Sequence, residues 1–466
     1  MGHQSETHPP ICQMQKISSH NPVFPYRKDI DGLRAIAVLS VIFFHLNSAW
    51  VSGGFIGVDL FFVISGYLIT GLICKDIEDN VFAIKSFYLR RIRRIAPSLL
   101  VMLITASCAA WLILKPEDII SFAYSLVAQF LSLQNFVFLS EGHYFIANNT
   151  KALLHTWSLA VEEQFYLFWP MLLVLLTRLP FKALLGVVSA IIVASFCLNT
   201  AITSSNPDAA FYLIFTRAWE FGLGGLAALW HENQQLTVNH RQLKLPHWIY
   251  ETLGWAGIVG LGYAILKINS GMPFPGKIAL IPTLAAFSLV LSGRSTKTTA
   301  SKILSLSPLV NIGLISYPLY LWHWPILVFM RYLDIKPTST LPFFIFWIAI
   351  LMLAYASYRW LEIPIRRKVW LTSQRSLLAG LAVSFAVLAA FAIHVLMTDG
   401  ASYRFNGKER VFLTARIQSY TKRCDITARI LDPTSSICKR RQEDGYQRKI
   451  LRWGDSRGSM LVPVLK

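Results

Sequence analysis

The chain has 466 residues, 54% of them hydrophobic, and its mean hydropathy is +0.47. It contains repeated apolar runs of about 20 residues, long enough to cross a bilayer, so the sequence predicts an all-α polytopic membrane protein. The net charge of +19 lies largely in short loops beside these runs, where basic residues set orientation in the membrane, and this argues against a nucleic-acid partner.

Residues 1–25 are polar and rich in His, Ser and Pro, which predicts a disordered cytoplasmic lead. Eleven transmembrane helices are then expected, at 33–50, 54–73, 97–114, 155–177, 183–203, 210–230, 249–267, 277–292, 308–330, 341–361 and 376–397.

A further apolar run, 119–139, decides the topology. If it crossed the membrane, the later basic loops would lie outside, against the positive-inside tendency. Polar residues interrupt the run, so we expect it to be amphipathic and either to lie along the outer surface or to re-enter. The N-terminus is then cytoplasmic and the C-terminus periplasmic.

Arg34 and His45 lie eleven residues apart inside one apolar run. A helix of that length separates them by about 16 Å, which places Arg34 near one membrane face and His45 more than halfway across. Ionisable groups at membrane depth are costly, so this pair is a candidate site. The alternative is a snorkelling arginine with a packed histidine.

Four arginines precede Pro97 at the cytoplasmic end of an expected helix. The planar guanidinium group suits phosphate, which indicates a site for a phosphorylated cofactor. A topology signal or a contact with lipid headgroups is the alternative. The residues concerned are Arg90, Arg91, Arg93 and Arg94.

Two adjacent carboxylates, Glu162 and Glu163, lie about two turns into another expected span. The spacing of four places Ser158, Glu162 and Tyr166 on one helical face. We expect this face at a depth similar to that of His45, where a carboxylate can orient an imidazole that acts as a general base. A buried network that fixes helix packing is the alternative.

Two later spans carry further polar groups. Arg217 and Glu220, three residues apart, predict an internal ion pair whose role is structural or catalytic. The i, i+4, i+7 spacing places Ser316, Tyr320 and His323 on one face, although the Tyr320 region also fits simple aromatic packing.

The six cysteines form no zinc-like pattern, and no metal is expected. Cys424 and Cys438 share the tail that follows the last span. In an oxidising compartment they could close a loop of about 15 residues, worth about 3 kcal/mol. Two unrelated reduced thiols are the alternative.

Five ordered motifs together resemble the acyltransferase-3 family, over about 26–368. They are Tyr26 to Val38, Gly54 to Tyr67, Arg90 to Pro97, Trp157 to Tyr166 and Ser316 to His323. The resemblance implies a ten-helix bundle in the bacterial inner membrane that O-acylates cell-envelope polysaccharides with acetyl groups from cytoplasmic acetyl-CoA. It also implies that Arg34 and His45 are essential.

The tail resembles the opening of the SGNH hydrolase-like domain that is often fused behind this membrane domain. The resemblance rests on Arg452 to Ser456 and implies that Ser456 matches a nucleophile. Arg457 replaces the usual His, and the sequence stops at Lys466, before the later Asp-x-x-His block. The expected domains are the lead at 1–25, the acyltransferase domain at 26–370, a linking helix at 371–400 and a truncated SGNH-like start at 401–466.

Taken with the resemblance, these residues predict an O-acetyltransferase. The four arginines would hold the CoA phosphates, Arg34 would steady the donor, and His45 would act as general base or transient acyl acceptor, oriented by Glu162 or Glu163. The passage would be lined by Tyr166, Arg217, Glu220, Tyr320 and His323.

The expected acceptor is a cell-envelope polysaccharide such as O-antigen, or a lipid-linked sugar. Membrane lipids and a separate SGNH-type protein are the other expected partners. A transporter or flippase of acyl or sugar groups, or an inactive truncated homologue, remains an alternative.

Overall fold

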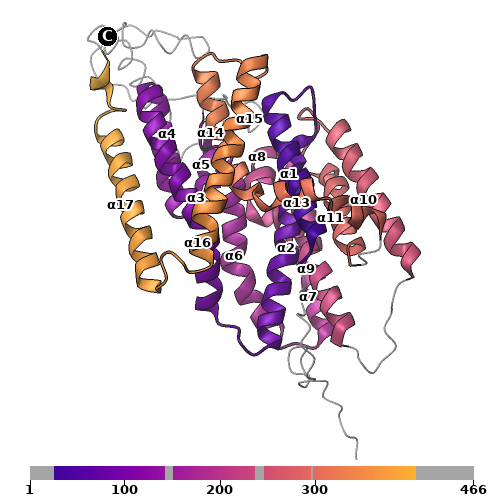
Figure 1. The fold of residues 1–466 in the computed structure, drawn as a ribbon. Helices are drawn as coiled ribbons and strands as arrows, with labels where there is room; N and C mark the ends of the chain where they lie inside the picture. Colours follow the sequence, from indigo (N-terminus) through magenta and orange to yellow (C-terminus); the bar gives the residue numbers. More distant parts are fainter. Residues whose placement is uncertain (1–25, 142–150, 237–245, 295–297, 406–466) are drawn as a thin grey trace, which may run out of the picture.

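The computed structural model describes residues 26–141, 151–236, 246–294 and 298–405, and every regular element within these ranges is helical. Figure 1 shows the long helices running side by side as a bundle. The expected lead, the Cys424 and Cys438 pair and Ser456 lie outside the described residues.

The first half of the bundle contains nine α-helices and one short 3₁₀ turn within the described residues. These are α1 (Lys28–Leu46), η1 (Gly54–Ile56), α2 (Gly57–Glu78), α3 (Ile84–Ile113), α4 (Pro116–Phe130), α5 (Gln134–Glu141), α6 (Thr156–Leu176), α7 (Phe181–Thr203), α8 (Pro207–Tyr212) and α9 (Ile214–Leu236).

The second half follows the same pattern, with several shorter pieces between the long helices. These are α10 (His247–Lys267), η2 (Lys277–Ala279), α11 (Leu280–Ser292), α12 (Thr299–Leu304), α13 (Ser307–Leu314), α14 (Ser316–Tyr332), α15 (Thr340–Ala356), η3 (Ser357–Glu362), α16 (Ile363–Arg366), α17 (Gln374–Met397) and η4 (Ser402–Arg404).

Among the described residues, seven helical stretches are long and apolar enough to cross a membrane, and the bent pair α13–α14 makes an eighth. The polytopic helical fold is therefore confirmed, whereas the count of eleven is not. Helices α1 and α9 carry several charged residues, and α11 has only 13 residues.

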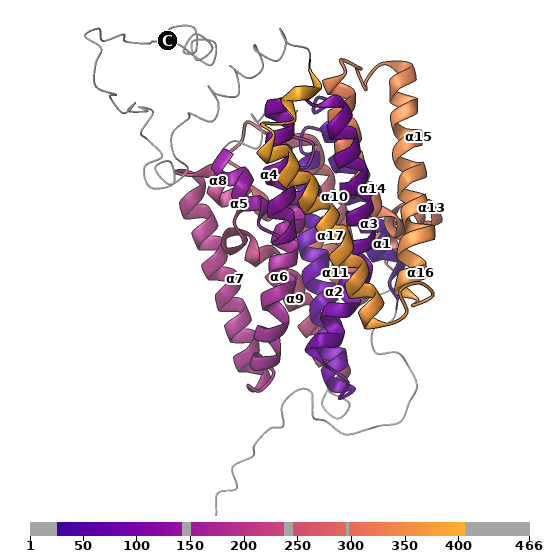
Figure 2. The ribbon, with the colours of Figure 1, turned by 90° about the vertical axis from the view of Figure 1, so that its left-hand side faces the viewer.

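The run 119–139, which decided the topology, is broken into two helices. Helices α4 and α5 have 15 and 8 residues, too few for either to span the bilayer alone. Their connecting turn approaches α6, where Ser132 hydrogen-bonds Glu163 and the Gln164 amide donates to the Ser132 carbonyl oxygen at 2.8 Å. In Figure 2, α17 lies along the outside of the bundle beside α4.

Helices α2 and α9 cross with their backbones in contact. A Cβ atom added to Gly66 would lie 1.9 Å from the Phe221 carbonyl oxygen, and one added to Gly224 would lie 1.9 Å from the Val63 carbonyl oxygen. Small residues permit this approach, which is a common way for helices to associate in membranes. Helix α2 is held in this way at the centre of the bundle.

Helices α13 and α14 meet at an angle of 67° beside Ile315, so α14 begins inside the bundle rather than at its end. Helix α1 contacts both of them. This bend places the polar first turns of α14 against α1, α3 and α6.

Candidate active site

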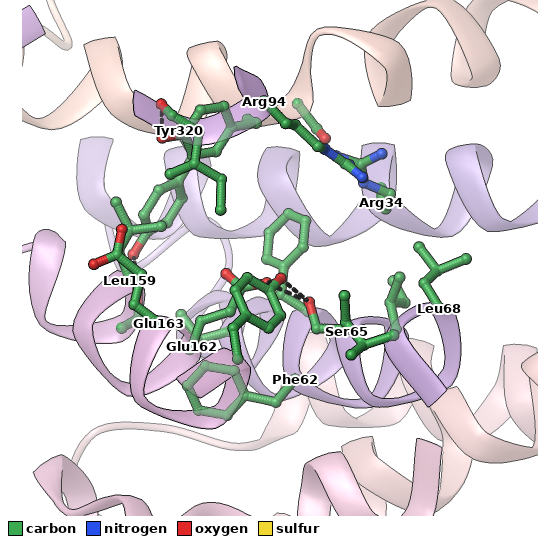
Figure 3. Close-up of a pocket in the computed structure, with 18 of the residues that line it drawn as sticks. Arg34, Phe62, Ser65, Leu68, Arg94, Leu159, Glu162, Glu163 and Tyr320 are labelled. Carbon is green, nitrogen blue, oxygen red and sulfur yellow. Dashed lines mark hydrogen bonds between the residues drawn. The ribbon is translucent and has the colours of Figure 1, made fainter. Parts of the chain in front are cut away.

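The polar motifs of five helices meet around one cavity, shown in Figure 3. Helices α1, α2, α3, α6 and α14 contribute to it, which brings together segments up to almost 300 residues apart in the sequence. Its polar lining consists of Arg34, Ser65, Arg91, Arg94, Ser158, Glu162, Glu163, Tyr166, Ser316, Tyr317 and Tyr320.

One side of the cavity is strongly basic. Figure 3 shows Arg34 and Arg94 close together there, and the Arg91 guanidinium carbon lies 5.8 Å from the centre of the Tyr166 ring. Arg34 pairs with Asp31 at 3.4 Å. Neither Arg91 nor Arg94 forms an ion pair with any described residue. Two uncompensated guanidinium groups therefore remain for an anionic ligand.

The other two arginines of the cluster are engaged elsewhere. Arg90 is exposed and pairs with Asp76. Arg93 is buried and donates to the carbonyl oxygens of Leu371 at 2.6 Å, Thr372 at 3.2 Å and Ser373 at 3.3 Å. The structure thus divides the predicted phosphate-binding cluster, since Arg93 anchors the segment before α17 and only Arg91 and Arg94 line the cavity.

The carboxylates of α6 are held by hydroxyl groups. Glu162 accepts hydrogen bonds from Ser65 and Tyr166, and Glu163 accepts one from Ser132. The predicted common face of Ser158, Glu162 and Tyr166 is confirmed, because all three side chains line the cavity.

The expected contact between these carboxylates and His45 is absent. Among the described residues, Glu162 and Glu163 hydrogen-bond only the hydroxyl groups just named. The expected orientation of His45 by one of these carboxylates is therefore not seen among the described residues. The bend before α14 brings His323 beside the end of α1, and His323 hydrogen-bonds the His45 imidazole.

His45 and His323 form a buried, stacked pair. His45 Nδ1 lies 3.0 Å from His323 Nε2, and the ring centres are 5.3 Å apart with an angle of 5° between the planes. The backbone carbonyl of His45 also accepts a hydrogen bond from Arg331, and the Trp324 ring lies 4.5 Å away. His45 is thus fixed from several sides.

The hydrogen-bond network assigns the tautomers of this pair. His323 Nδ1 lies 2.6 Å from the Tyr320 carbonyl oxygen, which can only accept, so His323 Nδ1 carries the proton. Nε2 of neutral His323 then accepts a hydrogen bond from Nδ1–H of His45. In neutral His45 the basic lone pair is consequently on Nε2.

Tyr320 connects the cavity to the histidines. Its hydroxyl group lies 2.7 Å from the Ser158 hydroxyl and donates to the His155 carbonyl at 2.9 Å, while its own carbonyl holds His323. The His155 ring stands edge-on to that of His323 at 5.8 Å. His155 was not among the predicted site residues, and the only available signal was its position beside the motif of Ser158.

Arg217 and Glu220 lie away from the cavity lining. The predicted ion pair is confirmed, with Nη1 of Arg217 3.2 Å from Glu220, and Nη2 also binds Asp59 at 3.0 Å. All three side chains are fully buried, and the guanidinium group lies 5.4 Å from the ring centre of Phe62. The ion-pair cluster of Asp59, Arg217 and Glu220 links α2 to α9 near the point where these helices cross closely.

Comparison with known proteins agrees with this arrangement. The family described as an acyltransferase domain matches residues 27–359. A Staphylococcus aureus (strain MSSA476) protein named "Putative O-acetyltransferase SAS0844" is 35% identical over 357 residues, which cover 74% of this chain and 58% of the relative. O-acetyltransferase OatA of S. aureus strain NCTC 8325 is 34% identical over 354 residues, with the same coverage of 74% and 58%.

The chain therefore spans less than two thirds of the length of these relatives. No solved structure matches it. Because the family match covers most of the chain and includes the helices that line the cavity, the chain belongs to the acyltransferase-3 family.

Proposed function

We propose that this protein is a membrane O-acetyltransferase. It takes the acetyl group from acetyl-CoA at the cytoplasmic face of the bacterial inner membrane. The acceptor is a hydroxyl group of a cell-envelope polysaccharide, such as O-antigen, or of a lipid-linked glycan at the periplasmic side. The names of the relatives support O-acetyl transfer. The observation that carries the proposal is the uncompensated basic cavity separated from a buried histidine pair by Tyr320.

The basic side of the cavity suits the donor. Arg91 and Arg94 have no acidic partner among the described residues, and each planar group can form two parallel hydrogen bonds to a phosphate. These two arginines, with Arg34 beside them, would bind the CoA phosphates near the end of the bundle. The slender pantetheine arm would then bring the thioester toward Tyr320.

The histidine pair supplies the proton transfer. Nε2 of His45 removes the proton from the acceptor hydroxyl as its oxygen forms a bond with the thioester carbonyl carbon. The bond from that carbon to sulfur then breaks, and the leaving CoA thiolate takes the proton from His45. His323 orients His45 through the Nδ1 hydrogen bond and stabilises the imidazolium formed in between. The ester product and free CoA thiol account for all atoms.

The direct test removes the proposed base. We expect His45→Ala to lower transfer of labelled acetyl from acetyl-CoA by on the order of 100-fold or more, the usual contribution of a positioned base. The assay uses the full chain in membrane vesicles, and labelled free acetate and labelled glycan are counted together.

Acetyl-CoA binding is the control, because the arginines lie apart from His45 and should still hold the donor. A folded, inserted His45→Ala protein with the wild-type rate would refute the role of His45. A wild-type protein that binds but never cleaves acetyl-CoA would favour the transport alternative instead.

A further inference from the structure

The imidazole of His155 is buried, and its hydrogen-bonding capacity is poorly met within the described part of the chain. Its side chain belongs to a residue that is 1% exposed, and neither ring nitrogen makes a hydrogen bond of normal geometry with a described residue. The Leu321 backbone carbonyl lies near the ring, but outside ordinary hydrogen-bond geometry. An unpaired polar ring in the interior destabilises a fold, so a histidine at this place needs an explanation.

Packing does not require a histidine here. The position of the residue is fixed through its backbone, because the His155 carbonyl accepts hydrogen bonds from Tyr320 at 2.9 Å and from Ser158 at 3.2 Å. The ring itself only touches neighbouring rings, at 5.6 Å from Tyr320 and 5.8 Å from His323 between centres. A phenyl ring would make the same contacts without burying unpaired nitrogen atoms.

Other polar groups around His155 already have partners. Ser158 bonds Tyr320, and His323 bonds both His45 and the Tyr320 carbonyl. The unmet hydrogen-bonding capacity of His155 therefore lies directly beside the pair to which we assign the proton transfer.

We propose that His155 binds the acceptor hydroxyl during the reaction. A neutral imidazole offers one donor and one acceptor, which matches a hydroxyl group. Its N–H donates to the hydroxyl oxygen and leaves the hydroxyl proton directed at Nε2 of His45. His155 transfers no proton itself. This inference rests on the proposed acetyl transfer and adds the group that selects an alcohol as acceptor.

The test replaces the ring by one of similar shape. We expect His155→Phe to insert normally, to unfold at the wild-type temperature or above, to bind acetyl-CoA with unchanged affinity and to transfer acetyl at least tenfold more slowly. His155→Gln keeps a donor and an acceptor and should recover part of the rate. The exposed His394 on α17, outside the matched family region, provides the control His394→Phe, which should transfer normally.

Full chains in membrane vesicles are compared with labelled acetyl-CoA, counting acetate and acetylated glycan together. A wild-type rate in His155→Phe would overturn the inference, as would a loss of rate accompanied by a lower unfolding temperature and lost acetyl-CoA binding, which indicates a structural role. The His45→Ala variant is assayed in parallel under the same conditions. If that variant is fully active, the proposed function fails whatever His155 does.

Discussion

Arg90 and Arg91 are neighbours in the sequence but point in different directions, because successive helical residues are rotated by about 100°. Arg90 is exposed and pairs with Asp76, whereas Arg91 is partly buried, faces Tyr166 and lines the cavity. An exposed ion pair contributes little to stability, about 0–1 kcal/mol. A guanidinium group without an acidic partner at the edge of a cavity is, in contrast, available to an anion.

This difference gives a prediction for donor binding. Arg91→Ala should weaken acetyl-CoA binding about tenfold or more, since a hydrogen bond to a charged group is worth about 1.5–3 kcal/mol. Arg90→Ala on the same helix should have a clearly smaller effect. Binding is measured by competition with labelled acetyl-CoA on membrane vesicles. An equal or larger loss in Arg90→Ala would contradict the assignment of the cavity as the phosphate site.

Within single helices, much of the site follows from sequence periodicity. The spacing of four predicts the common face of Ser158, Glu162 and Tyr166, and the spacing of three predicts the pair Arg217 and Glu220. Contacts between helices were not predictable in this way. Arg93 binds carbonyls about 280 residues further along the chain, and only the folded bundle brings these segments together.

The pairing of His45 with His323 shows the same limit. It depends on the bend between α13 and α14, which starts α14 inside the bundle and aligns its second turn with the end of α1. An apolar run in the sequence predicts a span but says nothing about such a break. The expected carboxylate partner of His45 was wrong for this reason.

The contact between α2 and α9 gives a prediction for helix packing. Gly224→Ala places a methyl group 1.9 Å from the Val63 carbonyl oxygen, so α9 must move away from α2 and strain the buried Arg217 group. We expect the Gly224→Ala protein, purified in detergent, to unfold at a markedly lower temperature than the wild-type protein, or not to fold at all. Gly262→Ala on α10 is the matched control, because a Cβ atom there meets nothing within 4 Å. Equal unfolding temperatures for the two variants would contradict the close packing.

For the molecule as a whole, the basic connections gather at one end of the bundle. Arg178 lies in the connection between α6 and α7, and Lys182 lies in the first turn of α7. Arg367 and Lys368 follow α16, which lies close to the start of α17 in Figure 1. The arginines at the start of α3 lie at this end as well. The positive-inside tendency therefore supports a cytoplasmic location for this end.

Cysteine labelling tests this orientation. Ser48 and Asp79 are both exposed. Ser48 lies in the connection between α1 and α2, and Asp79 directly follows the other end of α2. In a background without the native cysteines, Ser48→Cys should react with a membrane-impermeant maleimide in intact cells, whereas Asp79→Cys should react only after permeabilisation. The reverse pattern would place the arginine-lined cavity at the outer side and remove its access to cytoplasmic acetyl-CoA.

Tyr320 combines two tasks that belong to different parts of the residue. Its phenol hydroxyl, bound to Ser158 and to the His155 carbonyl, lies between the cavity and the imidazoles, while its main-chain oxygen sets the tautomer of His323. A rotation of the side chain about its Cα–Cβ bond breaks these two hydrogen bonds, at a net cost of about 1–3 kcal/mol. The backbone stays in place during such a rotation. In the proposed reaction, the Tyr320 side chain could therefore move aside for the acyl chain while His323 keeps the tautomer that leaves the lone pair of His45 on Nε2.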